Sequence, residues 1–226
     1  MNVQNAPVVI EVWTDLGCPW CYIGNHRLQT AIDRRPDAKR FEVRVRSFEL
    51  NTEAPHEPET IESAFLRSHG GDASVVLNAE RRIQELAQSE GLAFSLDRLN
   101  ANTFDFHRVV HHADEKSLGT RFFSAVQDRF FAGTINPFNH NVLVQVAESI
   151  GLNGDRVKDI LAGDEYAEDT RADRSEGIAL GVTGVPFVVF DRQVAAAGAQ
   201  SVEAYSRMLA QVAGVLTPVS KVEAHG

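Results

Sequence analysis

The chain has 226 residues, 43% of them hydrophobic and 23% charged, a balance typical of a globular protein with its own core. Its formal net charge of -9 makes nucleic acid and anionic membranes poor candidates for partners, because both are themselves negatively charged. No apolar run approaches the roughly 20 residues of a membrane helix, and residues 1–7 show no secretory leader. We therefore expect a cytoplasmic location.

The first fifty residues predict a β-α-β unit. Residues 8–13 are a short β-branched run of the kind found in buried strands. Residues 18–34 have apolar positions at helical spacing, and a proline follows shortly after them. Residues 41–48 alternate apolar and polar side chains, which predicts a half-exposed strand. Two parallel strands joined by a helix favour a right-handed crossover.

The stretch from about 50 to 180 differs, because apart from a loop rich in proline and glutamate at 53–59 it predicts mainly helices. Glycines separate these helices and suit left-handed helix ends. The clearest helical segments are 75–89, 106–118, 120–131, 141–150 and 164–180, and the punctuating glycines are Gly91, Gly119, Gly133, Gly151 and Gly163.

Strand patterns return near the end of the chain, at 186–191 and 193–197, and a last helix is predicted over 202–212. The tail at 216–226 is expected to fray. The order β-α-β, helical block, β-β-α predicts an α/β protein: a thioredoxin fold with a large helical insertion. The predicted boundaries are 1–50 and 181–226 for the thioredoxin-like core and 51–180 for the insertion.

The two cysteines of the chain, Cys18 and Cys21, stand three residues apart at the start of the first helix. A thiolate at a helix N-terminus is stabilised by free N–H groups and by the helix dipole, which predicts Cys18 as a nucleophile. Cys21 lies one turn further along the same face, where it is placed to attack a mixed disulfide on Cys18. Pro19 suits the first helical turn. The motif predicts thiol–disulfide chemistry.

A zinc site is the alternative interpretation of a close cysteine pair. Zinc normally takes four ligands, and the chain has no second Cys-x-x-Cys motif. The histidines at helical spacing that could complete such a site are His107 with His111 or His112, and these are more simply explained as side chains lining a surface or cleft. No metal is therefore predicted.

The segment from Asp15 to Gly24, Asp-Leu-Gly-Cys-Pro-Trp-Cys-Tyr-Ile-Gly, resembles the active-site signature of the DsbA-like oxidoreductases, specifically their FrnE-like branch. The resemblance extends over residues 8–212. Further matching stretches are Phe48-Glu49-Leu50-Asn51, Asn102-Thr103 with His107-Arg108, Gly181 to Phe187, and Gly198-Ala199-Gln200.

The resemblance implies a cis peptide bond between Val185 and Pro186, facing the thiols, with the backbone of Val185 offered to an extended substrate. It also implies cleft-lining roles for Asn102, Thr103 and His107, although helix capping competes as an explanation for Asn102 or Thr103. Trp20 is expected to be partly exposed and to contact substrate, and Trp13 to lie in the core.

One departure from the pattern concerns proton transfer. Many thioredoxin-fold relatives carry a buried acid six residues before the first cysteine, and Val12 stands there instead. Glu11 should point the opposite way along the strand, and Asp15 is nearer the motif. The proton acceptor for Cys21 is therefore not identified by the sequence.

Three functions are compatible with these features. The first is a thiol–disulfide oxidoreductase or isomerase acting on protein or small-molecule disulfides, with no bound cofactor. The second is a glutathione-dependent isomerase or transferase, related to hydroxychromene carboxylate isomerases and kappa-class glutathione transferases, with glutathione as co-substrate. Those relatives typically have serine at the position of Cys18, so two retained thiols favour the first. The third is a redox sensor without turnover. The sequence does not indicate an oligomeric state.

Overall fold

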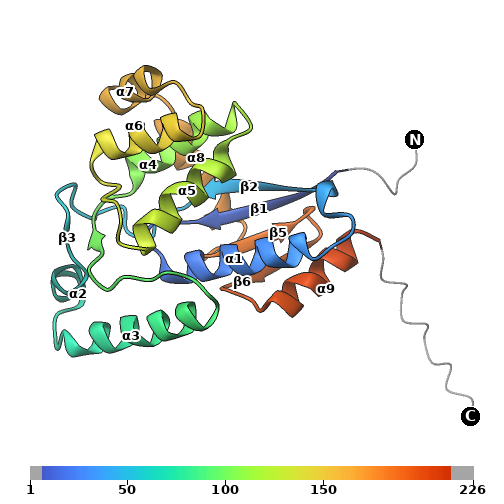
Figure 1. The fold of residues 1–226 in the computed structure, drawn as a ribbon, viewed down its shortest axis with the longest axis horizontal. Helices are drawn as coiled ribbons and strands as arrows, with labels where there is room; N and C mark the ends of the chain where they lie inside the picture. The colour runs from blue at the N-terminus through green and yellow to red at the C-terminus, as the bar shows by residue number, and fades with distance from the viewer. Residues whose placement is uncertain (1–6, 215–226) are drawn as a thin grey trace, which may run out of the picture.

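The computed structural model of the protein describes residues 7–214, so the tail predicted to fray lies outside the described residues. Strands and helices alternate at both ends of the chain, and helices dominate between them (Figure 1). The elements are β1 (Val8–Thr14), α1 (Pro19–Asp33), the 3-10 turn η2 (Ala38–Arg40), β2 (Phe41–Ser47), β3 (Glu59–Thr60), α2 (Ile61–His69), α3 (Ser74–Ser89), β4 (Leu99–Asn100), α4 (Phe104–Asp114), α5 (Gly119–Phe131), α6 (His140–Ser149), α7 (Gly154–Ala162), α8 (Ala167–Ala179), β5 (Phe187–Phe190), β6 (Val194–Ala197) and α9 (Val202–Val212).

The main sheet has the strand order β2-β1-β5-β6 within the described residues. β1 pairs with β2 in parallel, with Val8 opposite Phe41, and with β5 in antiparallel fashion, with Trp13 opposite Phe187. β6 pairs with β5 antiparallel. The parallel pair follows from the α1 crossover, and the antiparallel pairing of β5 with β6 follows from the short connection between them. The predicted α/β thioredoxin fold with a helical insertion is confirmed.

Helices cover both faces of this sheet. α1 and α9 lie side by side in front of it (Figure 1) and share one apolar core with alternate residues of β1, among them Ile10 and Val12. The opposite face carries Trp13, which is fully buried, as predicted, and packs with Phe48 and Val182. Strand periodicity explains the division, because neighbouring residues of β1 point to opposite faces.

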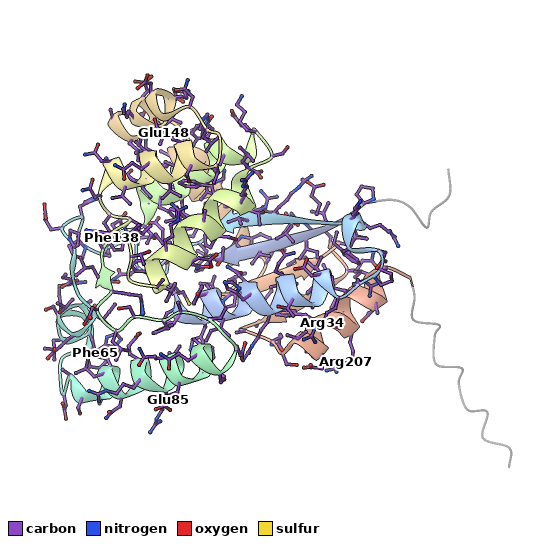
Figure 2. All side chains as sticks on the ribbon, in the orientation of Figure 1. Arg34, Phe65, Glu85, Phe138, Glu148 and Arg207 are labelled. Atoms are coloured by element: carbon purple, nitrogen blue, oxygen red, sulfur yellow. The ribbon has the colours of Figure 1, made fainter. Side chains whose placement is uncertain are left out.

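The inserted helices pack directly against the first turns of α1. Figure 2 shows side chains filling the space between the insertion and the sheet. The large apolar cluster of the insertion includes Leu16, Tyr22 and Ile23 from the core. The rings of Tyr22 and Phe131 stack with centroids 4.4 Å apart. The active-site helix and the insertion therefore share one apolar core, while the division at residues 50 and 180 into separate domains stays a prediction.

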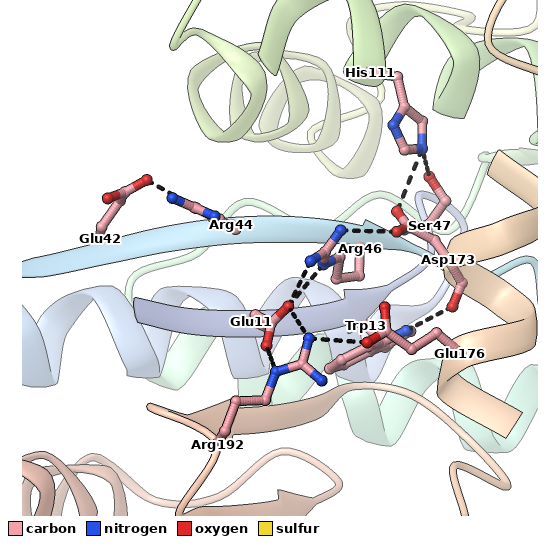
Figure 3. A network of polar contacts seen from close by, with 10 residues as sticks. All are labelled: Glu11, Trp13, Glu42, Arg44, Arg46, Ser47, His111, Asp173, Glu176 and Arg192. Atoms are coloured by element: carbon pink, nitrogen blue, oxygen red, sulfur yellow. Dashed lines mark hydrogen bonds and ion pairs between the residues drawn. The ribbon is translucent and has the colours of Figure 1, made fainter. Parts of the chain in front are cut away.

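A charged network joins the sheet to α8 and to the turn after β5 (Figure 3). Glu11 of β1 accepts hydrogen bonds from Arg46 of β2 and from Arg192. Arg46 also donates to Asp173 of α8 at 3.0 Å. Burial by itself raises the pKa of Glu11, but the two guanidinium groups lower it overall. Glu11 therefore pairs with these two arginines and is not the proton acceptor for the thiols.

Some predicted helix boundaries differ from the structure. Two helices were not singled out by the pattern, α2 and α7, and both are nine residues long. Gly91, Gly133 and Gly151 do have positive φ, as left-handed helix ends require. Gly119 instead begins α5, and Gly163 ends α7 in extended backbone. Among residues 7–214, no helix combines the length and apolar character needed to cross a bilayer.

Gly177 of α8 lies close against the sheet, since a Cβ there would lie 2.7 Å from Trp13 Cδ1. Replacing Gly177 with alanine is expected to lower the free energy of unfolding by about 1–2 kcal/mol, because overpacking outweighs the gain in helix propensity. Urea unfolding measures this change. The control is Gly184→Ala, whose Cβ would meet nothing within 4 Å. Equal losses in both variants would contradict the packing argument.

Candidate active site

The site lies where β1 ends and α1 begins, at the left end of the sheet in Figure 1. Cys18 is the N-cap of α1, with extended backbone (φ -79°, ψ 115°), and Pro19 occupies the first turn. Proline is tolerated there because first-turn N–H groups have no partner within the helix. The Cys18 side chain makes no capping hydrogen bond. Its sulfur therefore stands at the positive end of the helix, where a thiolate is stabilised.

Cys21 is the inner thiol. Its side chain is fully buried, and both cysteines are free thiols. The N–H of Asp15 donates to Cys21 Sγ at 3.5 Å. Burial raises the pKa of Cys21 well above its usual value and Cys18 raises it further, whereas Thr14 and Asp15 oppose the shift. Cys21 is therefore protonated at neutral pH.

The segment Val185-Pro186 faces the thiols. The peptide bond between these residues is cis, which confirms the prediction. The carbonyl of Val185 accepts a hydrogen bond from Cys18 Sγ at 3.5 Å. A Cβ on Gly24 would lie 2.9 Å from Pro186 Cγ, so the absence of a side chain at Gly24 allows α1 to approach this segment. The Val185-Pro186 segment thus contacts Cys18 directly, although Val185 lies 167 residues later in the sequence.

A buried pair of Asp15 and His107 lies beneath the motif. His107 Nε2 is 3.2 Å from Asp15 Oδ1, and the His107 side chain is fully buried. The other carboxylate oxygen of Asp15 accepts from the N–H of Leu50 at 2.9 Å. Burial raises the pKa of Asp15, but hydrogen bonds from His107, Leu50 and Thr103 lower it overall. An ionised Asp15 requires the His107 proton on Nε2, and Nδ1 has no hydrogen-bond partner within residues 7–214.

The predicted cleft residues divide into two groups. Asn102 lines a cavity of about 460 Å³ together with Glu49 and Arg174. It also caps the start of α4, because its Oδ1 accepts from the N–H of Phe104 at 2.9 Å. Thr103 and His107 are buried. The expectation that His107 lines a surface or cleft is therefore wrong, because packing of α4 against the Asp15 loop encloses it.

Glu49 has an unusual environment beside this pair. Its side chain is buried and accepts a hydrogen bond from Asn102 Nδ2 at 3.4 Å. Burial raises its pKa, and the charge of Asp15 adds to this, while His107 and Arg174 lower it in part. Glu49 therefore differs from Asp15, since its surroundings favour the neutral acid.

Two exposed apolar side chains belong to the segments around the buried thiols. Trp20, between the two cysteines, is 43% exposed, and Leu50, which follows Glu49, is 50% exposed. The partial exposure predicted for Trp20 is confirmed, and its contact with substrate stays a prediction. Within residues 7–214, no three His, Cys, Asp or Glu side chains are grouped so that they could hold a metal ion.

Two polar residues near the thiols were not identified by the sequence analysis, Thr14 and Gln127. Thr14 ends β1, in which Glu11 is the other polar residue, and is fully buried. Gln127 lies on the apolar stripe of α5, between Phe123 and Phe131 in helical spacing, and is also buried. A polar residue within an apolar stripe is a usable signal, because burying it requires a hydrogen-bond partner.

The two thiols should differ in reactivity. At neutral pH, iodoacetamide is expected to modify Cys18 at least about tenfold faster than Cys21, since Cys21 is enclosed and its raised pKa keeps it protonated. Peptide mass spectrometry of the reduced protein after brief labelling measures the two rates. Labelling in denaturant is the control and should remove the difference. Preferential modification of Cys21 in the folded protein would contradict the assignment.

The comparisons with known proteins agree with this geometry. Residues 9–210 match the DSBA-like thioredoxin domain. The probable DsbA oxidoreductase SCO1869 from Streptomyces coelicolor is 33% identical, covers 97% of this chain and 95% of its own, and superposes with a TM-score of 0.85.

Two more distant structures show the same fold. A 2-hydroxychromene-2-carboxylate isomerase is 17% identical, with a TM-score of 0.69 over 92% of this chain and 100% of its own. The cytosolic disulfide reductase DsbM from Pseudomonas aeruginosa, also solved with GSH, is 15% identical, with a TM-score of 0.62 over 92% of this chain and 100% of its own. On the match of residues 9–210, this chain is a member of the DsbA-like thioredoxin family.

Proposed function

We propose that the protein is a dithiol–disulfide oxidoreductase in which Cys18 attacks a substrate disulfide and Cys21 completes the exchange. The observation that carries this proposal is the asymmetry of the pair. Cys18 stands at the start of α1 against the Val185 carbonyl, and Cys21 lies behind it, buried and protonated. An outer nucleophile and an inner resolving thiol are what two-step exchange requires.

The reaction divides into two displacements. The Cys18 thiolate attacks one sulfur of R–S–S–R′, forming a mixed disulfide with R and releasing R′S⁻. Cys21 then attacks Cys18 Sγ, so that the Cys18–Cys21 bond forms and the bond to R breaks. The electron pair leaves on RS⁻, which takes the proton of Cys21 and departs as RSH. The substrate is reduced and the protein oxidised, and the same steps in reverse oxidise a dithiol substrate.

The substrates we propose are peptides or small molecules that carry a disulfide or dithiol. Exposed Trp20 and Leu50 supply an apolar surface beside the motif. Val185 borders the thiols in a segment that suits pairing with an extended peptide. We assign the protein to the FrnE-like branch on its motif and place it in the cytoplasm, as with the cytosolic reductase DsbM. No bound cofactor is required, and glutathione is a candidate co-substrate.

A glutathione-dependent isomerase is the second candidate, supported by the fold shared with 2-hydroxychromene-2-carboxylate isomerase. In that reaction glutathione would be the nucleophile and the side chain at position 18 would only orient its thiolate. The buried Cys21 would then have no chemical task. Its placement one turn behind Cys18 therefore favours the oxidoreductase.

Trapping tests the leading proposal. The wild-type protein should catalyse reduction of insulin disulfides by dithiothreitol. Cys21→Ser should instead accumulate a covalent adduct on Cys18, because the serine hydroxyl cannot attack the mixed disulfide. Non-reducing gel electrophoresis followed by mass spectrometry identifies the trapped substrate. Absence of exchange in the wild type, together with no adduct in Cys21→Ser, would overturn the proposal.

A further inference from the structure

Cys21 has to become a thiolate when it attacks the mixed disulfide, although burial favours its neutral form. Val12 stands where many thioredoxin-fold relatives carry a buried acid, and it is buried among apolar side chains. The titratable groups near Cys21 are Cys18, Asp15 with His107, and Tyr205 of α9. The carboxylate of Asp15 is already engaged by Leu50 and His107. The Cys21 thiolate therefore has to be stabilised by hydrogen bonds from neutral donors.

A chain of three neutral side chains leads to Cys21. It begins at Gln127, whose Nε2 donates to the carbonyl oxygens of Asp15 at 3.3 Å and Leu16 at 3.4 Å. Carbonyl oxygens only accept hydrogen bonds, so these two contacts determine which end of the Gln127 amide faces them. Its Oε1 is thereby turned toward Asn25 and accepts from Asn25 Nδ2 at 3.2 Å.

Asn25 transmits this orientation to Thr14. The same Nδ2 group donates to Thr14 Oγ1 at 3.4 Å. A lone pair of the Thr14 hydroxyl is then occupied by a donor, so the hydroxyl proton points elsewhere. The N–H of the next residue, Asp15, donates to Cys21 Sγ at 3.5 Å, which places this end of β1 against the sulfur, and the Thr14 hydroxyl lowers the pKa of Cys21 in opposition to burial. Thr14 is fully buried, so water does not compete for its hydroxyl, while Gln127 is 2% exposed and Asn25 is half-buried. Gln127 thus donates to the loop carbonyls and accepts from Asn25, and Asn25 donates in turn to Thr14.

We propose that Gln127, Asn25 and Thr14 are positioning residues that aim the Thr14 hydroxyl at Cys21 and so stabilise the Cys21 thiolate during the second displacement. The proposal rests on the dithiol function. In it, the Thr14 hydroxyl stabilises the Cys21 thiolate in a site that has Val12 where many thioredoxin-fold relatives carry a buried acid. The three side chains do not relay a proton, because the Asn25 Nδ2 group that meets Thr14 is only a donor and cannot accept a proton from the hydroxyl. The Cys21 proton still ends on the departing thiolate. Gln127 belongs to α5, so the helical insertion contributes to the redox centre.

The test uses dithiobis(nitrobenzoate), an aromatic disulfide that reports the two displacements separately. Attack by Cys18 releases the first thionitrobenzoate, and attack by Cys21 on the mixed disulfide releases the second. Stopped-flow absorbance measures both rates for the full-length protein. Because the probe reacts with any accessible dithiol, the measurement stands even if insulin proves not to be a substrate, and so the two proposals fail independently.

Thr14→Val is expected to slow the second release about tenfold and to move its pH dependence upward by about one unit, while the first release is unchanged. A hydrogen bond to a charged group is of this strength. Thr14→Ser keeps the hydroxyl and should restore both values. Thr120→Val is the matched control, since Thr120 lines the same cavity as Asn25 and Gln127 but donates its hydroxyl to the Val43 carbonyl. It should leave both releases unchanged.

Asn25→Asp tests the orientation of the chain. Aspartate only accepts, so it would draw the Thr14 proton away from Cys21 and slow the second release as much as Thr14→Val does. In the Thr14→Val background the same change should add little, because the hydroxyl is already gone. Full additivity would show a simple charge effect and overturn the proposal. An unchanged second release in Thr14→Val, or equal slowing of both releases, would overturn it as well.

Discussion

Replacing Cys18 with serine is expected to reduce disulfide exchange at least about a hundredfold, equivalent to about 2.7 kcal/mol of lost transition-state stabilisation. Cys18 stands at the start of α1 and contacts the Val185 carbonyl, whereas Cys21 is enclosed behind it. Serine keeps the size and the helix start but remains a hydroxyl at neutral pH. The retained Cys21 does not replace it, because burial keeps that thiol protonated. Insulin reduction under steady-state conditions measures the loss.

The same variant separates the two candidate functions. In a glutathione-dependent isomerase the residue at position 18 only orients the glutathione thiolate, and a serine hydroxyl donates that hydrogen bond as well as a thiol does. Cys18→Ser should then retain isomerase turnover on a chromene carboxylate. Undiminished turnover in this variant, with no exchange activity in the wild type, would reverse the order of the two proposals. Circular dichroism of both proteins controls for folding.

Local sequence patterns were sufficient to predict the strands of the main sheet and the position of the two thiols at the start of α1. The β-branched run before the motif predicts β1, and Cys-x-x-Cys at a helix start predicts Cys18 as N-cap, both of which the structure contains. Contact between Cys18 and Val185 spans 167 residues and came from resemblance, not from periodicity. Short helices such as α7 were less visible, because nine residues hold too few turns for a secure pattern.

Burial of polar side chains could not be predicted in the same way. His107 is near the apolar face of α4, but its enclosure depends on a loop 92 positions earlier in the chain. Periodicity assigns a residue to a helix face and does not tell which polar group will meet it there. The pairing of Thr14, Asn25 and Gln127 has the same origin, since the side chains of Asn25 and Gln127 meet only where α5 packs on α1.

The buried pair beneath the motif gives the second large expected effect. Replacing His107 with leucine should lower the free energy of unfolding by about 3–5 kcal/mol at pH 7, because it leaves the enclosed Asp15 carboxylate without its hydrogen-bond donor. Asp15→Asn should cost less, about 1–3 kcal/mol, since the amide is neutral. The double variant should lose less than the sum of the two, because each single change removes the same interaction. Urea unfolding gives all three values.

The pH dependence of Asp15→Asn follows from the direction of the Asp15 pKa. Burial raises that pKa, but His107, Leu50 and Thr103 lower it overall, so the folded protein binds the proton less tightly than the unfolded chain. The stability gained from the carboxylate is complete above the unfolded value of about 3.9 and is lost as the pH falls through the lower folded value. The difference between wild type and Asp15→Asn should therefore shrink below about pH 4.

Glu49→Gln is the matched control, with the opposite sign. Burial and the nearby Asp15 charge raise the pKa of Glu49, so its ionisation opposes folding as the pH rises through the folded value. Removing that charge should leave stability at pH 7 unchanged or higher, although Glu49 is buried in the same region as Asp15. A loss in Glu49→Gln as large as in Asp15→Asn would show that any polar change here destabilises the fold. The specific pairing of Asp15 with His107 would then no longer explain the result.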